Sequence, residues 1–181
     1  GVEECDDGNV VNTDGCDNGC KAHERWTHKG VAKDVPLADL HRWEECYSAL
    51  YSDSGPVAAP MKACTGDHIL VACRTVGADT LTLAAHAPRD DVFYMPQVNP
   101  NNGERHDANG VGWYWSPSYK LIGFSPAGNF KSCTLNGQNE HVCWHSTLIS
   151  QAFEGAGRCG AVYTIDAVGK TLERVVMQSW D

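Results

Sequence analysis

The sequence predicts a mainly β protein: a disulfide-stapled β-sandwich or barrel-like domain with little helix, preceded by a small Cys/Asp-rich module. Three observations support this fold class. Short segments rich in β-branched and aromatic residues recur at regular spacing, separated by Gly, Pro, Asn and Asp. Nine cysteines are spread along the 181 residues. Acidic residues concentrate at the start of the chain, where residues 1–24 hold seven of them against one Lys.

These patterns divide the chain into three parts. Residues 1–24 contain almost no apolar side chains, so they cannot form a core and must be held by bridges, by an ion or by a neighbour. Residues 25–36 show no periodicity and end at Pro36, which is typical of a linker. Residues 37–181 are predicted to form the disulfide-stapled β domain.

The strands of this domain are predicted from its apolar segments, and helix is scarce. Residues 37–51 are the best helix candidate because Leu37, Leu40 and Tyr47 approach helical spacing, although Trp43 and Tyr47 fit a strand equally well. Residues 61–64 and 146–153 would each form only a short helical turn. The predicted strands cover residues 68–76, 80–85, 91–95, 111–116, 120–124, 141–145, 160–165 and 172–178.

Charge and hydropathy exclude two classes of partner. Lys and Arg number 14 against 23 Asp and Glu, a net charge of −9 with no basic run, which argues against a nucleic-acid binder. No apolar stretch approaches the roughly 20 residues that cross a bilayer, so no membrane span is expected.

The cysteines indicate an oxidising compartment. Their spacing contains no Cys-x-x-Cys pair, which leaves zinc-ribbon and thioredoxin interpretations without support. We therefore expect disulfides and an extracellular or cell-surface location. An odd number leaves one thiol that pairs with a missing segment, pairs with another molecule or stays free. The predicted disulfide residues are Cys5, Cys16, Cys20, Cys46, Cys64, Cys73, Cys133, Cys143 and Cys159.

Sequence alone does not fix the connectivity of these bridges. Because neighbouring strands of a β-meander lie close together, we expect Cys46 or Cys64 to pair with Cys73. For the same reason Cys133 is expected to pair with Cys143 or Cys159.

Oxygen-bearing side chains crowd the loop between Cys5 and Cys20. Ca²⁺ requires six to eight converging oxygens at about 2.3–2.6 Å, and such a loop supplies them. The alternative is that these residues only form turns in a disulfide knot, since the spacing is not that of an EF-hand. The predicted calcium ligands are Asp6, Asp7, Asn9, Asn12 and Asp14.

The same segment carries a family resemblance. Glu-Glu-Cys-Asp-Asp-Gly-Asn, then Asn-x-Asp-Gly-Cys and a further Cys, covers residues 2–20 and resembles the Myxococcus-type cysteine-rich repeat of secreted proteins. It is also similar to modules of the pappalysin metalloproteases, in which related repeats are linked to calcium. The resemblance implies an extracellular address. The family's leading Cys-Gly-(Asn/Asp)-Gly is absent, and so is a His-Glu-x-x-His zinc motif, so no protease activity is implied.

The main domain carries a weaker likeness. Its Trp-, Cys- and Gly-anchored layout, as in Cys143-Trp144-His145, resembles uncharacterised secreted bacterial Cys/Trp-rich domains. That resemblance supplies no catalytic residues.

An aromatic strand and the polar loop before it form the candidate ligand site. On a strand, Trp113 and Trp115 share one face while Tyr114 lies on the other. Flat rings stack on the C–H faces of sugars, and polar loop residues bind their hydroxyls. The alternative is that the tryptophans pack the sandwich interior. The predicted ligand-binding residues are Trp113, Trp115, Tyr119, Asn101, Asn102, Arg105, Asp107 and Asn109.

Catalytic and metal motifs are incomplete. His141 and His145 flank Cys143 at a spacing that permits a zinc or copper pair, but no zincin Glu is present and Cys143 is better used in a bridge. Ser125 lies in Gly-Phe-Ser-Pro-Ala-Gly, which fails Gly-x-Ser-x-Gly by one residue, and Pro126 lacks the N–H of an oxyanion hole. We therefore predict no catalytic residue.

The leading functional hypothesis is an extracellular ligand-binding module, adhesin-like or lectin-like, whose partner is carbohydrate or another cell-surface ligand. One alternative is a structural or self-assembling surface or filament protein, joined between molecules through the odd cysteine. A second alternative is a secreted hydrolase or metalloenzyme.

Overall fold

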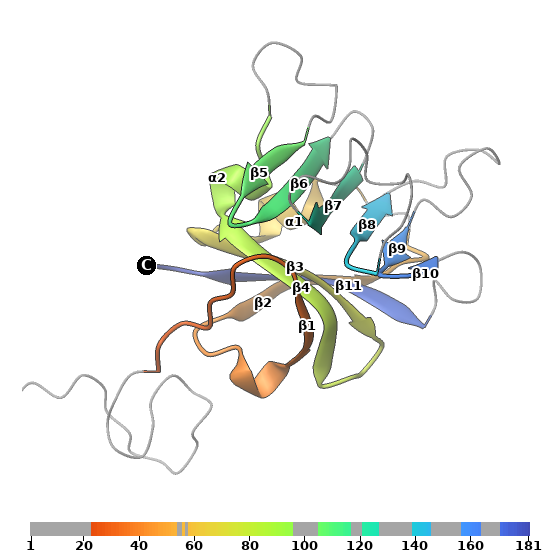
Figure 1. Cartoon of the computed structure of the whole chain (residues 1–181), viewed down its shortest axis with the longest axis horizontal. Helices are drawn as coiled ribbons and strands as arrows, with labels where there is room; N and C mark the ends of the chain where they lie inside the picture. The colour runs from red at the N-terminus through yellow and green to blue at the C-terminus, as the bar shows by residue number, and fades with distance from the viewer. Residues whose placement is uncertain are drawn as a thin grey trace, which may run out of the picture.

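The computed structural model describes residues 23–53, 56, 58–95, 105–116, 121–126, 139–145, 157–163 and 171–181. These residues form two antiparallel sheets, one five-stranded and one six-stranded, in a sandwich-like arrangement (Figure 1). The predicted mainly β fold with little helix is therefore confirmed.

The five-stranded sheet has the order β1-β4-β3-β11-β2. Its central pairing is between β3 and β11, so a strand from the end of the described chain lies between two early ones. This sheet is therefore closed by residues far apart in sequence. Its strands are β1 (Ala32–Pro36), β2 (Glu44–Leu50), β3 (His68–Thr75), β4 (Thr80–Pro88) and β11 (Leu172–Ser179).

The six-stranded sheet is a meander in which each strand pairs with the next along the chain, in the order β10-β9-β8-β7-β6-β5. Only local pairings are needed to build it. Its strands are β5 (His106–Ala108), β6 (Val111–Ser116), β7 (Leu121–Pro126), β8 (Val142–His145), β9 (Arg158–Cys159) and β10 (Val162–Tyr163).

Several predicted elements differ from the observed ones. Residues 37–51 are not a helix: the 3-10 turn η1 (Leu37–Asp39) precedes β2, where Tyr47 pairs with Val176 of β11. Residues 91–95 are not a strand, because β4 ends at Pro88 and the chain turns through the short helix α2 (Arg89–Val92). Residues 32–36 of the predicted linker form β1 against β4. A short turn near residues 61–64 is present as α1 (Ala59–Ala63), and residues 146–153 lie outside the described residues.

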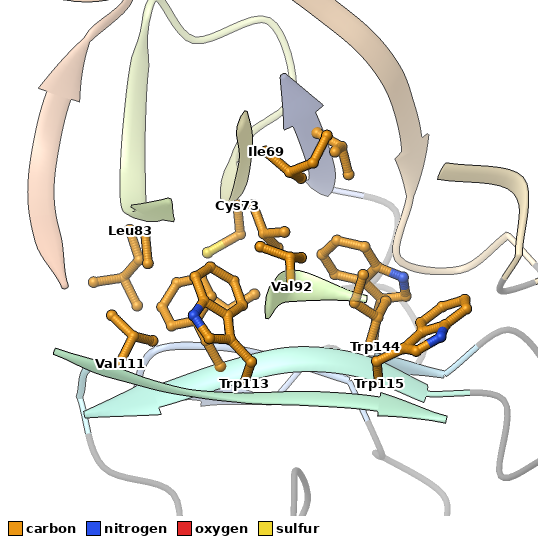
Figure 2. Close-up of a cluster of buried hydrophobic side chains, with 14 of the residues drawn as sticks. Ile69, Cys73, Leu83, Val92, Val111, Trp113, Trp115 and Trp144 are labelled. Carbon is orange, nitrogen blue, oxygen red and sulfur yellow. The ribbon is translucent and has the colours of Figure 1, made fainter. Parts of the chain in front are cut away.

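The core between the sheets is built from aromatic residues of one sheet and aliphatic residues of the other. Figure 2 shows Trp113, Trp115 and Trp144 rising from the six-stranded sheet toward Ile69, Cys73 and Leu83. Trp113 packs edge-on against Phe124 at 5.7 Å, and Trp115 against Phe93 at 5.2 Å between ring centroids. Edge-to-face packing at these separations is the favoured geometry of aromatic pairs.

The five-stranded sheet is also buried on its outer face. Leu70, Ala72 and Val175 pack there under Trp43, with Trp26 at the margin. We call residues 23–31, which run across this face, the N-terminal strap. Two buried faces explain why residues 69–73 form an uninterrupted apolar run instead of alternating with polar residues.

Two disulfides join described cysteines, Cys46–Cys64 and Cys73–Cys159, and Cys143 is disulfide-bonded as well. The expected pairing of Cys46 or Cys64 with Cys73 was wrong. Of the two partners expected for Cys133, Cys159 is excluded by its bond to Cys73, and the pairing with Cys143 stays a prediction. Cys73 points into the core, so its partner comes from β9 of the opposite sheet and not from a neighbouring strand. Cys5, Cys16, Cys20 and Cys133 lie outside the described residues.

Within the described residues, no helix is long and apolar enough to cross a membrane.

Candidate functional site

The candidate site lies where α2 follows β4 and β5 begins. We call it the α2–β5 corner and define it by Asp91, Tyr94, Met95, Arg105, His106 and Asp107. Figure 1 places α2 directly beside β5 at one end of the sandwich. Residues 96–104, which connect the two sides, lie outside the described residues.

Buried contacts fix the α2 side of the corner from within. Arg89 donates from Nε to the carbonyl oxygen of Cys64 at 3.1 Å and from Nη2 to that of Met61 at 2.9 Å. Val92 and Phe93 are buried in the core. Because these three residues anchor a single helical turn, Asp91 and Tyr94 are left at the surface.

The central feature of the corner is a stacked pair of rings. Tyr94 and His106 lie 4.2 Å apart between centroids with 18° between their planes. His106 Nε2 lies 2.7 Å from Asp91 Oδ1, which holds the imidazole in place. Tyr94 remains 40 % exposed and Met95 45 % exposed, although both are large apolar side chains. The corner thus presents a fixed aromatic surface to solvent next to a carboxylate.

A charged pair borders this surface on the β5 side. Arg105 Nε donates to Asp107 Oδ1 at 2.7 Å. The Arg105 side chain lies across Gly112, where an added Cβ would come within 2.8 Å of Arg105 Cδ. Gly112 therefore gives Arg105 room to lie flat against β6.

The predicted ligand-binding residues fall into four groups. Trp113 and Trp115 are 1 % and 2 % exposed in the core, which is the alternative role that the strand pattern left open, so the structure offers neither ring to a ligand. Arg105 and Asp107 lie at the corner, as an ion pair with each other. Asn109 uses its amide nitrogen for the carbonyl oxygens of His28 and His86. Asn101, Asn102 and Tyr119 lie outside the described residues.

Sequence reasoning missed Asp91, Tyr94 and His106. A strand over residues 91–95 would have separated Asp91 and Tyr94 onto opposite faces, whereas the α2 turn brings both to His106. The sequence did contain a clue to these residues: the acidic Asp91 and the aromatic Tyr94 precede the polar loop, and His106 follows it.

A second polar cluster lies on the outer face of the six-stranded sheet but is closed to solvent. Tyr114 Oη and Ser125 Oγ lie 3.4 Å apart, and the rings of Tyr114 and His141 lie 6.3 Å apart. Tyr114, Ser125, His141 and Arg158 are all at most 3 % exposed. Burial lowers the pKa of His141 to about 4, with the charge of Arg158 adding to the effect, and burial raises the pKa of Tyr114. In the described structure Ser125 and His141 are thus fully buried, and neither side chain is presented to solvent.

The metal hypotheses have different outcomes. Cys143 is disulfide-bonded and so is not a thiolate ligand beside His141. Among the described residues no group of three or more His, Cys, Asp or Glu side chains is arranged to hold a metal ion. The predicted calcium ligands Asp6, Asp7, Asn9, Asn12 and Asp14 lie outside the described residues.

Comparison of the chain with protein-family models, with curated proteins and with solved structures finds no match in any of the three.

Proposed function

We propose that the protein is a secreted ligand-binding module, and that its α2–β5 corner binds carbohydrate. The observation that carries this proposal is the exposed ring of Tyr94, held in a fixed orientation by His106 and Asp91. A large aromatic side chain at a solvent-exposed and internally anchored position is a common feature of binding surfaces.

The orientation of Tyr94 matters because a flexible ring loses entropy when a ligand immobilises it. Stacking on His106 and anchoring through Phe93 remove much of that cost before a ligand arrives. The C–H face of a pyranose ring would rest on the exposed part of Tyr94. Sugar binding therefore requires little rearrangement of the described residues.

The polar groups of the corner favour a neutral sugar. Asp91 and Asp107 carry carboxylate oxygens that accept hydrogen bonds from hydroxyls, and such charge-assisted bonds are short and strong. Arg105 is paired with Asp107, and Arg89 donates to backbone carbonyl oxygens. Both guanidinium groups therefore already have partners, which disfavours an anionic ligand.

A glycan array with the whole chain tests this function. Tyr94→Ala removes the ring, and we expect it to weaken binding about tenfold or more, as truncation of a central aromatic contact does. Asp91→Asn keeps the shape of the side chain but removes its charge and loosens His106, and should weaken binding less.

Trp180→Ala is the matched control, because Trp180 is also an exposed aromatic residue, at 46 %, and lies outside the corner. It should bind like the parent protein. The proposal fails if the parent binds no glycan, or if Tyr94→Ala and Trp180→Ala bind equally well.

Calcium in the first 20 residues is a separate part of the proposal, supported by the crowded oxygen ligands of Asp6, Asp7, Asn9, Asn12 and Asp14. We expect chelator to make residues 1–24 sensitive to protease and Asp14→Ala to have the same effect. Equal proteolysis with and without calcium would favour a simple disulfide knot. The secreted location is supported by the disulfides.

A further inference from the structure

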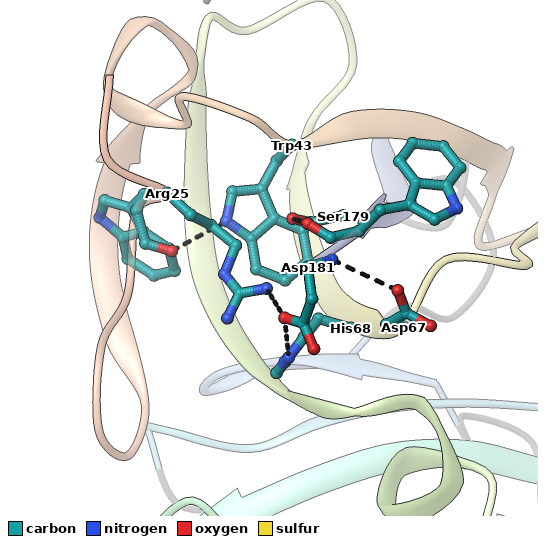
Figure 3. Close-up of polar contacts among 8 residues, drawn as sticks. Arg25, Trp43, Asp67, His68, Ser179 and Asp181 are labelled. Carbon is teal, nitrogen blue, oxygen red and sulfur yellow. Dashed lines mark hydrogen bonds and ion pairs between the residues drawn. The ribbon is translucent and has the colours of Figure 1, made fainter. Parts of the chain in front are cut away.

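The N-terminal strap is held onto the five-stranded sheet by polar contacts as well as by apolar ones. Trp43 donates from Nε1 to the carbonyl oxygen of Trp26 at 2.9 Å. Figure 3 shows the Asp181 carboxylate between Arg25 of the strap and His68 of β3, with both contacts at 3.1 Å. The strap is thus tied to both the start of β3 and the end of the described chain.

The innermost strap contact is made to a buried histidine. The backbone N–H of His28 donates to His86 Nε2 at 3.0 Å. Nε2 accepts this bond only when it carries no proton, so the folded protein requires neutral His86 with its hydrogen on Nδ1. His86 is 6 % exposed, and Nδ1 has no hydrogen-bond partner among the described residues.

His86 also connects the strap to the turn between β5 and β6. Asn109 in this turn donates from Nδ2 to the carbonyl oxygen of His28 at 2.8 Å and to that of His86 at 2.9 Å. The backbone N–H of Gly30 donates in return to the carbonyl oxygen of Asn109 at 2.8 Å. The strap, β4 and the turn therefore form one hydrogen-bonded unit around the His86 ring.

The surroundings of His86 oppose a positive charge. Trp26 and Trp43 cover it at 5.7 and 5.4 Å between ring centroids. The charged and titratable groups that face it are Arg25 and His28 of the strap and His68 of β3, while the nearby carboxylate of Asp181 is paired with Arg25 and His68. Burial first, and then the charges of His68, Arg25 and His28, lower the pKa of His86 to about 4, and a backbone hydrogen bond with His28 opposes this to a smaller extent.

We propose that His86 is an acid-sensitive latch: protonation of Nε2 replaces the hydrogen bond from His28 with two opposed N–H donors, and the strap and the β5–β6 turn are released together. Both partners would then be donors 3.0 Å apart, with no acceptor between them. The new charge would also repel Arg25 and His68. Release removes these penalties because it opens His86 to water.

Release would also affect the α2–β5 corner, a consequence that rests on the proposed function. β5 is only three residues long, and it joins the latched turn to His106. Loss of the turn would free the side of the corner that supports Tyr94. Acidification is therefore expected to weaken ligand binding.

Hydrogen exchange of the ligand-free chain between pH 7 and pH 4, corrected for intrinsic exchange rates, tests the latch without any ligand. We expect peptides covering residues 23–31 and 106–112 to lose protection together as the pH approaches about 4. Amides of β3 and β11 at the centre of the sheet should stay protected. Failure of carbohydrate binding would leave this result untouched, so the two proposals are distinguishable.

His86→Gln keeps a hydrogen-bond acceptor but does not titrate, and it should abolish the pH-dependent loss of strap protection. His23→Gln is the matched control, because His23 stacks on His41 and should leave the transition in place. Nuclear magnetic resonance of the unmodified protein adds a test independent of both variants, in which His86 must be the Nδ1–H tautomer at pH 6. The latch is excluded if the strap stays protected at pH 4, if His86→Gln retains the transition, or if His86 is the Nε2–H tautomer.

Discussion

The outer faces of the two sheets both carry buried residues, but the share of polar residues among them differs. On the five-stranded sheet, apolar residues such as Leu70 and Val175 pack under Trp43 and the N-terminal strap. On the six-stranded sheet, the buried outer residues include the polar Ser125 and Arg158, next to a small cluster of Tyr114 and the disulfide-bonded Cys143. An apolar face needs only a cover, whereas a polar face needs hydrogen-bond partners for each group.

Each face contains one buried histidine whose pKa burial lowers to about 4, His86 on the first and His141 on the second. Their surroundings give this shared property different consequences. His86 accepts a hydrogen bond from the strap, which is a separate segment of the chain. His141 directly precedes β8, with Arg158 of the neighbouring β9 nearby. Protonation of His86 is therefore expected to affect the strap, and protonation of His141 the start of β8.

The largest loss of unfolding free energy should come from removing the disulfide that joins the two sheets. The Cys73–Cys159 bridge spans 86 residues and Cys46–Cys64 spans 18. Loop entropy predicts a loss of about 4.5 kcal/mol of unfolding free energy for Cys73→Ala with Cys159→Ala, and about 3 kcal/mol for Cys46→Ala with Cys64→Ala. Denaturant unfolding measures both. If the two losses of unfolding free energy are equal or in the reverse order, the disulfide between the sheets does not stabilise the protein by lowering the conformational entropy of the unfolded chain.

Removal of the apolar cover should have the next largest effect. Trp43→Ala deletes a buried ring from the outer face of the five-stranded sheet and should cost about 3–5 kcal/mol. Trp43→Phe should cost clearly less, because it keeps much of the apolar contact. Both substitutions remove the Trp43 Nε1–H, but only Trp43→Ala also removes most of the apolar contact. If the two variants are equally stable, the hydrogen bond from Nε1 to Trp26 and not the packing of the ring holds the strap.

Acid should weaken both faces over the same pH range. The unfolded chain protonates each histidine near pH 6.5, while folded His86 and His141 stay neutral to about pH 4. Stability is therefore full above pH 6.5 and is lost as the pH falls toward 4, by up to about 3 kcal/mol for each histidine. Thermal unfolding of His86→Gln and His141→Gln across this pH range measures how much each histidine contributes to the loss of stability. If neither substitution changes the dependence of stability on pH, these histidines do not cause the loss of stability in acid.

The smallest effect should come from a single polar contact. Tyr114→Phe removes the hydroxyl beside Ser125 without changing the shape of the ring. A loss of about 1 kcal/mol is expected, as for one buried hydrogen bond. Ser125→Ala combined with Tyr114→Phe should cost less than the sum of the two single changes. Strict additivity in this double-mutant cycle would show that the two hydroxyls do not interact.

The proposed site was less predictable from the sequence than the strands. The polar loop ahead of the β6 strand led to Arg105 and Asp107, which do lie at the α2–β5 corner. The sequence prediction also placed Trp113 and Trp115 in the ligand site. The alternation of residues along a strand shows that their side chains share a face, but it does not show which face packs against the other sheet. Tyr94 was missed because its exposure depends on Val92 and Phe93 being buried in a turn that the sequence pattern favours as a strand.

The mainly β class, most of the strands and the presence of disulfides follow from local features of the sequence. β-Branched and aromatic segments between turn residues, such as those of β3 and β6, specify extended backbone without information from distant residues. Three contacts became known only from the folded structure: the pairing of β11 with β3, the Cys73–Cys159 disulfide and the hydrogen bond from His28 to His86. These contacts join residues 58 or more positions apart. They depend on which faces of the two sheets come together, and the short-range pattern of a sequence does not encode that choice.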